Sequence, residues 1–308
     1  MIISICKGGL GNRLKSLSSC YAIAKKTGRM LGIVWETDLR CDAGFSYLFS
    51  NEIICSSLDW ILSKNNISLY TNADWVKQYY PNLFPIVKKY GCINLDKTSK
   101  IINDNNDLIV VYSNDYLNGC TAKECKAFFD WLTPINVIEE KLQKLQKHLQ
   151  LDKTFVGVHA RGTDYECGGV TVKTYLERMD AEYKKNKNVK FFVCSDSLEY
   201  ETIIKNSFPQ VYINKKENYV FKANNDSDWR NNVQRPLESV QDALVDMYLL
   251  SKTNFKIYHP NSTFAHIVNM MSLGVLQRNP VEKRQSKYYK YFRTIKKIVK
   301  NWGCKKNV

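Results

Sequence analysis

Four polar or glycine-rich runs in this chain carry groups that could bind a phosphate, and each follows a short apolar segment. They occupy residues 8–13, 159–164, 194–196 and 259–264. Glycine lets the backbone approach a ligand closely, and the first N–H groups of a following helix suit an anion. We therefore expect these runs to bind a phosphorylated small molecule in one shared cleft.

Arg161 is the strongest single candidate among these residues. It stands in the run His159-Ala-Arg-Gly-Thr-Asp164. The guanidinium group offers a fixed fork of donors that fits a diphosphate, and it stays charged at every relevant pH. In a nucleotide-sugar transferase this charge would stabilise the departing nucleoside diphosphate as the glycosidic bond breaks. The structural alternative is an ion pair between Arg161 and Asp164 that closes the loop.

The other runs also have both a binding and a structural interpretation. Ser195 and Asp196 could hold a ribose or a base edge, or they could cap a helix. Ser262 and Thr263 could form an anion site with the start of a helix, or serve only as its N-cap. The run 8–13 is an incomplete dinucleotide fingerprint, and tight turns often look similar. The prediction of one cleft rests on the four runs taken together.

The segments around these runs alternate between apolar strands and helix-like periodicity. Strands are predicted at 2–6, 31–35, 108–112, 155–159, 190–194, 210–213 and 255–259, and helices at 12–27, 134–150, 172–185, 198–207, 237–251 and 263–272. This alternation indicates βαβ units and parallel sheets, which bind ligands at the carboxyl ends of their strands. Residues 38–105 are expected to form short helices and acceptor-binding loops, and residues 214–235 a loop.

The length of 308 residues is about twice that of a typical domain, so two domains sharing a cleft are expected. We predict an N-terminal α/β domain at 1–150, on the acceptor side and containing the glycine-rich turn at 8–13. A C-terminal, Rossmann-like nucleotide-sugar domain is predicted at 151–275, and a basic tail at 276–308. The helix at 134–150 would connect the two halves.

The net charge of +15 is concentrated in the tail. Residues 283–308 contain ten Lys or Arg and no acidic residue, which leaves +5 for the other 282 residues. Tyr288, Tyr291, Ile295, Ile298 and Trp302 recur at helical spacing between the lysines, which suits an anionic membrane surface. Alternatively, this helix packs against the N-terminal domain with its lysines solvated. A nucleic-acid-binding protein needs basic residues along a folded face, whereas here they are concentrated in the tail, so no nucleic-acid partner is expected.

The sequence also bears on compartment and metals. The longest apolar runs are far shorter than the roughly 20 residues of a membrane-spanning helix, and residues 1–6 lack the basic leader of a targeting segment. A cytoplasmic chain, either free or peripheral on the membrane, is the resulting expectation, with its ten cysteines reduced. Cys120 and Cys125 form no CxxC pair and have no nearby histidine, so no metal site is predicted.

The polar runs resemble signatures of the fucosyltransferase superfamily, which includes the α1,6-, α1,2- and protein O-fucosyltransferases and the nodulation fucosyltransferase. Residues 158–164 resemble its H-x-R-R-x-D motif, 191–196 its strand ending in Ser/Thr-Asp, 246–251 with 262–264 its closing D…LS…S-x-F motif, and 8–13 the G-G-x-G-N-Q opening. The similarity spans roughly residues 1–35 and 150–275.

This resemblance implies a GT-B type fold, with two Rossmann-like domains facing each other across a cleft. It implies inverting transfer of fucose from GDP-fucose to a glycan or glycolipid, with no cofactor and no essential metal. Arg161 would contact the β-phosphate. The implied donor-binding residues are Gly11, Asn12, Arg13, His159, Arg161, Ser195, Asp196, Asp246, Ser262, Thr263 and Phe264.

Two positions depart from the superfamily pattern. Gly162 stands where the motif usually has a second arginine, which leaves a transferase using another nucleotide sugar as an alternative. Gly169 stands where the α1,6 branch has its proposed base, so Glu166 and then Asp164 are the candidate bases beside Arg161 in the catalytic set. A nucleotide-sugar-binding protein without turnover is the alternative from another functional class.

Overall fold

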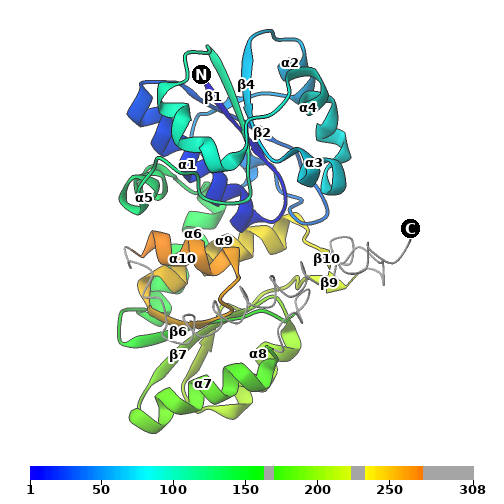
Figure 1. Cartoon of the computed structure of the whole chain (residues 1–308). Helices are drawn as coiled ribbons and strands as arrows, with labels where there is room; N and C mark the ends of the chain where they lie inside the picture. Colours follow the sequence, from blue (N-terminus) through cyan, green and yellow to red (C-terminus); the bar gives the residue numbers. More distant parts are fainter. Residues whose placement is uncertain (163–169, 223–232, 273–308) are drawn as a thin grey trace, which may run out of the picture. The chain divides into compact units, whose positions relative to one another are not determined.

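The protein contains two parallel β-sheets, and the polar runs of the candidate site follow strands of these sheets (Figure 1). The structure is a computed structural model, and it describes residues 1–162, 170–222 and 233–272. The predicted tail at 276–308, and the candidate bases Asp164 and Glu166, lie outside the described residues.

The first sheet has five strands in the order β3-β2-β1-β5-β4. Their bounds are β1 Ile2–Cys6, β2 Leu31–Trp35, β3 Ile54–Cys55, β4 Ile67–Tyr70 and β5 Leu108–Tyr112. All five residues of β1 are buried, because β1 lies between β2 and β5 and is followed by helix α1, Leu10–Thr27. The central position of β1 places the glycine-rich turn at the middle of the carboxyl edge of the sheet.

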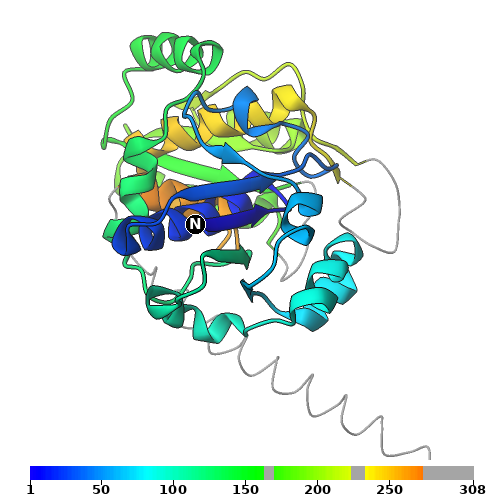
Figure 2. The same cartoon turned by 90° about the horizontal axis from the view of Figure 1, so that it is seen from above.

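Short helices complete this half. They are η1 Phe45–Tyr47, α2 Leu58–Leu62, α3 Ala73–Tyr79, η2 Pro81–Leu83, α4 Phe84–Tyr90, η3 Leu95–Asn103 and α5 Ala122–Trp131. Helices α2, α3 and α4 lie side by side (Figure 2). The predicted short helices of the 38–105 region are present. The sequence interpretation missed strands β3 and β4, which are only two and four residues long, and helix α5.

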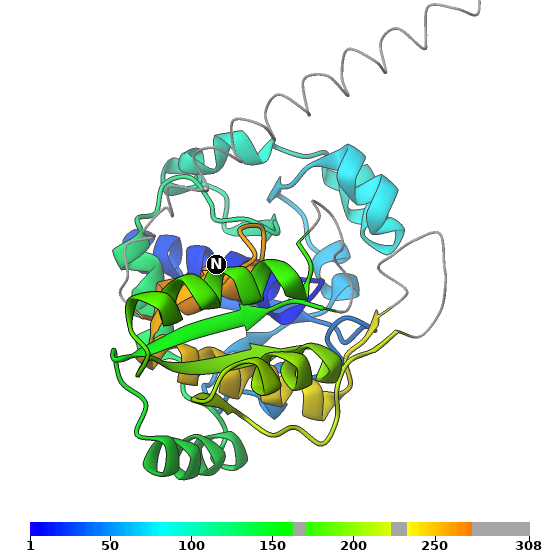
Figure 3. The ribbon, with the colours of Figure 1, turned by 90° about the horizontal axis from the view of Figure 1, so that it is seen from below.

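The second sheet has four strands in the order β11-β6-β7-β8. Their bounds are β6 Phe155–Ala160, β7 Lys190–Ser195, β8 Val211–Ile213 and β11 Asn254–Tyr258. Helices α7, Val172–Lys185, and α8, Leu198–Ser207, cover one face (Figure 3). Helices α9, Leu237–Lys252, and α10, Thr263–Met271, cover the other. The predicted loop at 214–235 contains an antiparallel pair, β9 Phe221–Lys222 with β10 Val233–Gln234.

Helices from the two halves pack directly on one another. Helix α1 contacts α10, and α6, Asn136–Leu149, contacts α9. One core cluster contains Leu14 of α1, Phe128 of α5, Leu244 of α9 and Val268 of α10. The two sheets therefore belong to one compact unit, Met1–Leu273, and the domain boundary at residue 150 stays a prediction. No helix in the described part of the chain is long and apolar enough to cross a membrane.

Candidate active site

Both sheets reverse their strand order beside a central strand. In the first sheet β1 lies between β2 and β5, and in the second β6 lies between β7 and β11. Ligands of open parallel sheets bind outside the carboxyl ends of the strands at such switch points. A pocket opens there, and it takes its lining from both halves of the chain.

Most of the residues predicted to bind the donor line this one pocket. They are Gly11, Asn12, His159, Arg161, Ser195, Asp196, Asp246, Ser262, Thr263 and Phe264. The structure thus brings together four runs that are far apart in the sequence, as the prediction of one cleft requires.

Arg13 is the exception. Its side chain is fully buried. Its guanidinium donates to the carbonyl oxygens of Gly8 and Glu36, each at 2.7 Å, and its Nη2 lies 3.2 Å from the carboxylate of Asp38. Arg13 therefore fixes the glycine-rich turn to the loop after β2. The sequence could not reveal this, because a basic residue near a glycine-rich turn has the same pattern in either role.

The N-termini of α1 and α10 meet at Gly11. A Cβ atom placed on Gly11 would lie 2.8 Å from the backbone N of Phe264 and 2.9 Å from the hydroxyl of Thr263. Only glycine allows this approach. The first N–H groups of a helix have no partner within it, and the helix dipoles add positive potential there. The two helix starts together bring N–H donors and positive potential from both halves to one place, an arrangement suited to an anion.

The turn after β6 is held by contacts that orient Arg161. The backbone N–H of Arg161 donates to the hydroxyl of Tyr175 at 3.2 Å, and the N–H of Gly162 donates to Asp196 Oδ1 at 2.7 Å. The His159 ring stacks on Phe264, with 4.1 Å between centroids and an interplanar angle of 9°. Asp196 is therefore a support of this turn as well as a lining residue.

Two serines in the lining use their hydroxyls to hold the backbone. Ser195 Oγ donates to the carbonyl of Ala160 and accepts from the N–H of Ser197 at 3.1 Å. Ser262 Oγ accepts from the N–H of Ala265 at 3.3 Å, so it is the N-cap of α10. The structural alternative given for Ser262 in the sequence analysis is thus realised, and the cap shapes the pocket wall.

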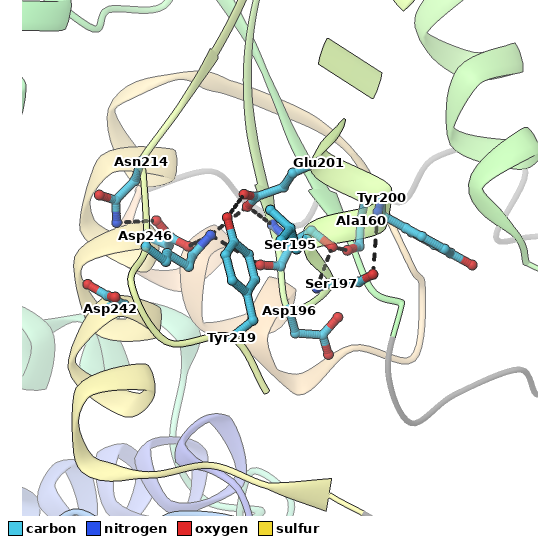
Figure 4. Close-up of polar contacts among 12 residues, drawn as sticks. Ala160, Ser195, Asp196, Ser197, Tyr200, Glu201, Asn214, Tyr219, Asp242 and Asp246 are labelled. Carbon is cyan, nitrogen blue, oxygen red and sulfur yellow. Dashed lines mark hydrogen bonds and ion pairs between the residues drawn. The ribbon is translucent and has the colours of Figure 1, made fainter. Parts of the chain in front are cut away.

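A buried charge network contributes Lys216, Tyr219 and Asp246 to the lining of the pocket (Figure 4). Lys216 Nζ lies 2.5 Å from Glu201 Oε1 and 3.1 Å from Asp246 Oδ2, and it donates to the carbonyl of Ser195 at 3.1 Å. Asn214 donates to Asp246 Oδ1 at 3.0 Å, and the Tyr219 hydroxyl donates to Glu201 at 2.5 Å. These contacts fix Asp246 and the chain around Lys216 against the carboxyl end of β7.

The network changes the pKa values of Asp246 and Lys216. Burial raises the pKa of Asp246 to about 6; Lys216 opposes this shift and Glu201 adds to it. Burial lowers the pKa of Lys216, but the carboxylates of Asp246 and Glu201 outweigh it, so the net direction is upward. Lys216 therefore stays charged at neutral pH while Asp246 titrates within the physiological range. One ammonium group faces two carboxylates, so the three side chains carry a net negative charge when Asp246 is ionised.

Several lining residues were missed by sequence reasoning. They include Arg40, Lys216, Asn218, Tyr219 and Arg235. Arg40 had a usable signal, because it belongs to a polar run after strand β2, like the predicted runs. Lys216 and Tyr219 had none, since they stand in a polar stretch that was taken for a loop.

Two expectations from the sequence concern the cysteines and a metal site. The eight cysteines in the described ranges are free thiols, with the sulfurs of Cys120 and Cys125 3.5 Å apart. In the same ranges no group of three or more His, Cys, Asp or Glu side chains is placed to hold a metal ion. The predicted metal independence is left to experiment.

Comparison with solved structures identifies the class of fold. NodZ fucosyltransferase from Bradyrhizobium matches with a TM-score of 0.60 and 20% identity over 87% of this chain and 91% of that one. NodZ α-1,6-fucosyltransferase co-crystallized with GDP gives 0.59 and 19%, with the same coverage. POFUT1 in complex with GDP-fucose gives 0.51 and 14%, covering 88% and 93%. The predicted α/β fold of the GT-B type is confirmed.

The family follows from the sequence itself. The family model for nodulation protein Z (NodZ) matches residues 92–282, which is more than half of the chain. The chain belongs to the NodZ family. No curated protein sequence matches it significantly.

Proposed function

We propose that this protein is a GDP-fucose-dependent fucosyltransferase that transfers fucose, with inversion, to a glycan or glycolipid. Three findings support the donor. The chain belongs to the NodZ family. Solved NodZ structures of the same fold are described as co-crystallized with GDP and soaked with GDP-fucose. The pocket combines two helix N-termini and Arg161 with the carboxylates of Asp196 and Asp246, which suits a nucleoside diphosphate.

The observation that carries the proposal is the convergence of two helix N-termini and Arg161 in one pocket. A diphosphate placed there accepts hydrogen bonds from backbone N–H groups and from the guanidinium. When the bond between fucose C1 and the β-phosphate oxygen breaks, negative charge grows on GDP. Fixed donors and dipoles stabilise this charge more than they stabilise the ground state, which lowers the barrier.

The nucleoside end fits the carboxylates of Asp196 and Asp246. Carboxylate oxygens accept hydrogen bonds, and guanine and ribose supply N–H and O–H donors. Both oxygens of Asp246 already accept one bond each within the protein, and each retains a further lone pair. The ring of Tyr219 lines the same pocket and offers an apolar face to a base.

The transfer forms one bond and breaks another. The oxygen of the acceptor hydroxyl attacks fucose C1 on the face opposite GDP, the C1–O bond to the β-phosphate breaks, and its electron pair leaves with GDP. The hydroxyl proton passes to a base, and Glu166 and Asp164 remain the proposed candidates, outside the described residues. Arg161 acts on the leaving group in this scheme.

The acceptor is proposed to approach over the first half of the chain. Aromatic rings gather there: Trp75 stacks on Tyr112 at 5.3 Å and contacts Tyr80 at 5.4 Å, and Tyr79 is exposed. Aromatic side chains are common in ligand sites. Tyr80 lies next to Arg40 of the pocket lining, at 5.3 Å, so the aromatic group adjoins the donor pocket.

Calorimetry with GDP, UDP, CMP and ADP tests the proposal, with and without a chelator. We expect tight binding of GDP alone, independent of chelator, followed by fucose transfer from GDP-fucose but not mannose transfer from GDP-mannose. Arg161→Ala should weaken GDP binding and abolish transfer. Lys184→Ala, which removes the same charge from an exposed position, is the matched control. Binding of UDP or CMP in place of GDP would refute GDP-fucose as the donor. GDP binding without transfer to any glycan acceptor would refute the proposed transferase activity.

A further inference from the structure

The turn after β6 has room for one arginine. A Cβ atom on Gly162 would lie 2.7 Å from the Cβ of Ser197 and 3.0 Å from the ring of Tyr200. A side chain at position 162 would therefore collide with the start of α8. Arg161 is the single guanidinium that this turn directs at the pocket, although a nucleoside diphosphate carries more than one negative charge.

A second guanidinium enters the pocket from the opposite half. Arg40, in the loop after β2, lines the pocket beside Gly9 and Asn12. A Cβ atom on Gly8 would lie 3.8 Å from Arg40 Nη1 and 3.2 Å from Asn12 Nδ2. These distances place the Arg40 guanidinium next to the N-terminus of α1, where the proposed phosphate-binding surface begins.

The backbone of Arg40 is fixed on both sides. Asp38 and Cys41 exchange backbone hydrogen bonds of 3.3 and 2.9 Å, and the N–H of Arg40 donates to Asp38 Oδ1 at 2.9 Å. From the second half of the chain, the N–H of Arg235 donates to the carbonyl of Leu39 at 2.8 Å. A side chain on such a fixed loop is held ready for a ligand, so little ordering remains to be done on binding.

The charge of Arg40 is incompletely matched by the described residues around it. The carboxylate of Asp38 lies closer to Arg13, at 3.2 Å, than to Arg40 Nη2, at 3.8 Å. A separation of 3.8 Å is longer than the donor–acceptor distance of a hydrogen bond. The other contact is the face of the Tyr80 ring, 5.3 Å away, and it uses no N–H donor. The guanidinium keeps donors for an anion while its stem is packed in place.

We propose that Arg40 binds the diphosphate of the donor from the N-terminal half, opposite Arg161, so that the two guanidinium groups hold the leaving group between them. This inference rests on the proposed function. It adds a specific consequence: Arg40 serves recognition of the second phosphate, and it contributes to nucleoside diphosphates and not to nucleoside monophosphates.

The test compares GDP and GMP binding by calorimetry in the full-length protein. Arg40→Met keeps the packing against Tyr80 and removes the charge, Arg40→Lys keeps the charge without the fork, and Lys77→Met is the matched exposed control. We expect Arg40→Met to weaken GDP binding by about 10-fold or more, because a charge-assisted hydrogen bond is lost. Arg40→Lys should lose less, and GMP affinity should stay within about twofold.

The outcomes separate this inference from the function on which it rests. An unchanged GDP affinity in Arg40→Met, in a protein whose GDP binding Arg161→Ala weakens, overturns the role of Arg40 alone. An equal loss of GDP and GMP affinity in Arg40→Met also overturns it. Absence of GDP binding by the wild-type protein refutes the proposed function itself.

Discussion

Replacing Lys216 by methionine would leave two buried carboxylates without their shared cation. The Lys216 side chain is 6% exposed, and those of its partners Glu201 and Asp246 are 1% and 4% exposed. Methionine fills a similar volume, so the change removes charge and hydrogen bonds with little loss of packing. Removing one partner of a buried ion pair costs about 3–5 kcal/mol, because the remaining charge stays desolvated.

The cost should depend on pH in a defined direction. Without Lys216 the pKa of Asp246 rises further, because Lys216 is the charge that lowers it. The folded state then takes up a proton at a higher pH than the unfolded state. A carboxyl group with a raised folded pKa loses stability as pH increases from its unfolded pKa, about 4, through its folded pKa. The pKa of Asp246 is already about 6 with Lys216 present. The deficit of Lys216→Met is therefore expected to be larger at pH 7.5 than at pH 5.

Urea unfolding of both proteins at these two pH values measures the effect. Lys184→Met is the control, since its ion pair with Asp180 is exposed, and such pairs contribute about 0–1 kcal/mol. Asp246→Asn in the Lys216→Met background should recover part of the lost stability. A deficit below about 1 kcal/mol, or one that is equal at pH 5 and 7.5, would refute the argument that this network is held together by charge.

Three further predictions concern the pocket and the tail. Gly11→Ala should destabilise the protein by about 1–3 kcal/mol and weaken GDP binding, because the added Cβ would lie 2.8 Å from the backbone N of Phe264. Thermal unfolding measures the stability and calorimetry the affinity, and unchanged values would contradict the close contact between α1 and α10. GDP affinity should fall as pH decreases through about 6, where Asp246 becomes protonated and accepts fewer hydrogen bonds. Asp246→Asn should flatten this pH dependence of the affinity, and a pH dependence that persists in Asp246→Asn would come from another group. Deleting residues 284–308 should abolish binding to anionic liposomes in a sedimentation assay, and unchanged binding would refute membrane docking by the tail.

The regular elements of the second half were predictable because their signals are local. Strands β6 and β7 are buried apolar runs, and α7 and α8 show helical spacing that the structure reproduces with end shifts of a residue or less. Backbone hydrogen bonds within a helix join near neighbours, so periodicity is sufficient to find them. Strand β4 could not be found from such a local signal. Ile67–Tyr70 is short and fully buried, and its pairing with β5 is decided by packing across the sheet.

The residues of the candidate site also fall into two groups, those that the sequence reveals and those that only packing brings to the pocket. The sequence by itself determined the turn-forming glycines, Arg161 and the polar strand ends, since residue type and position after a strand fix what a strand end can bind. Only the tertiary structure decided that Arg13 is buried, that Lys216 neutralises Asp246, and that Arg40 faces the pocket. These roles depend on which distant segments approach within a few ångströms, and burial and charge pairing act through space, so sequence position alone carries no record of them.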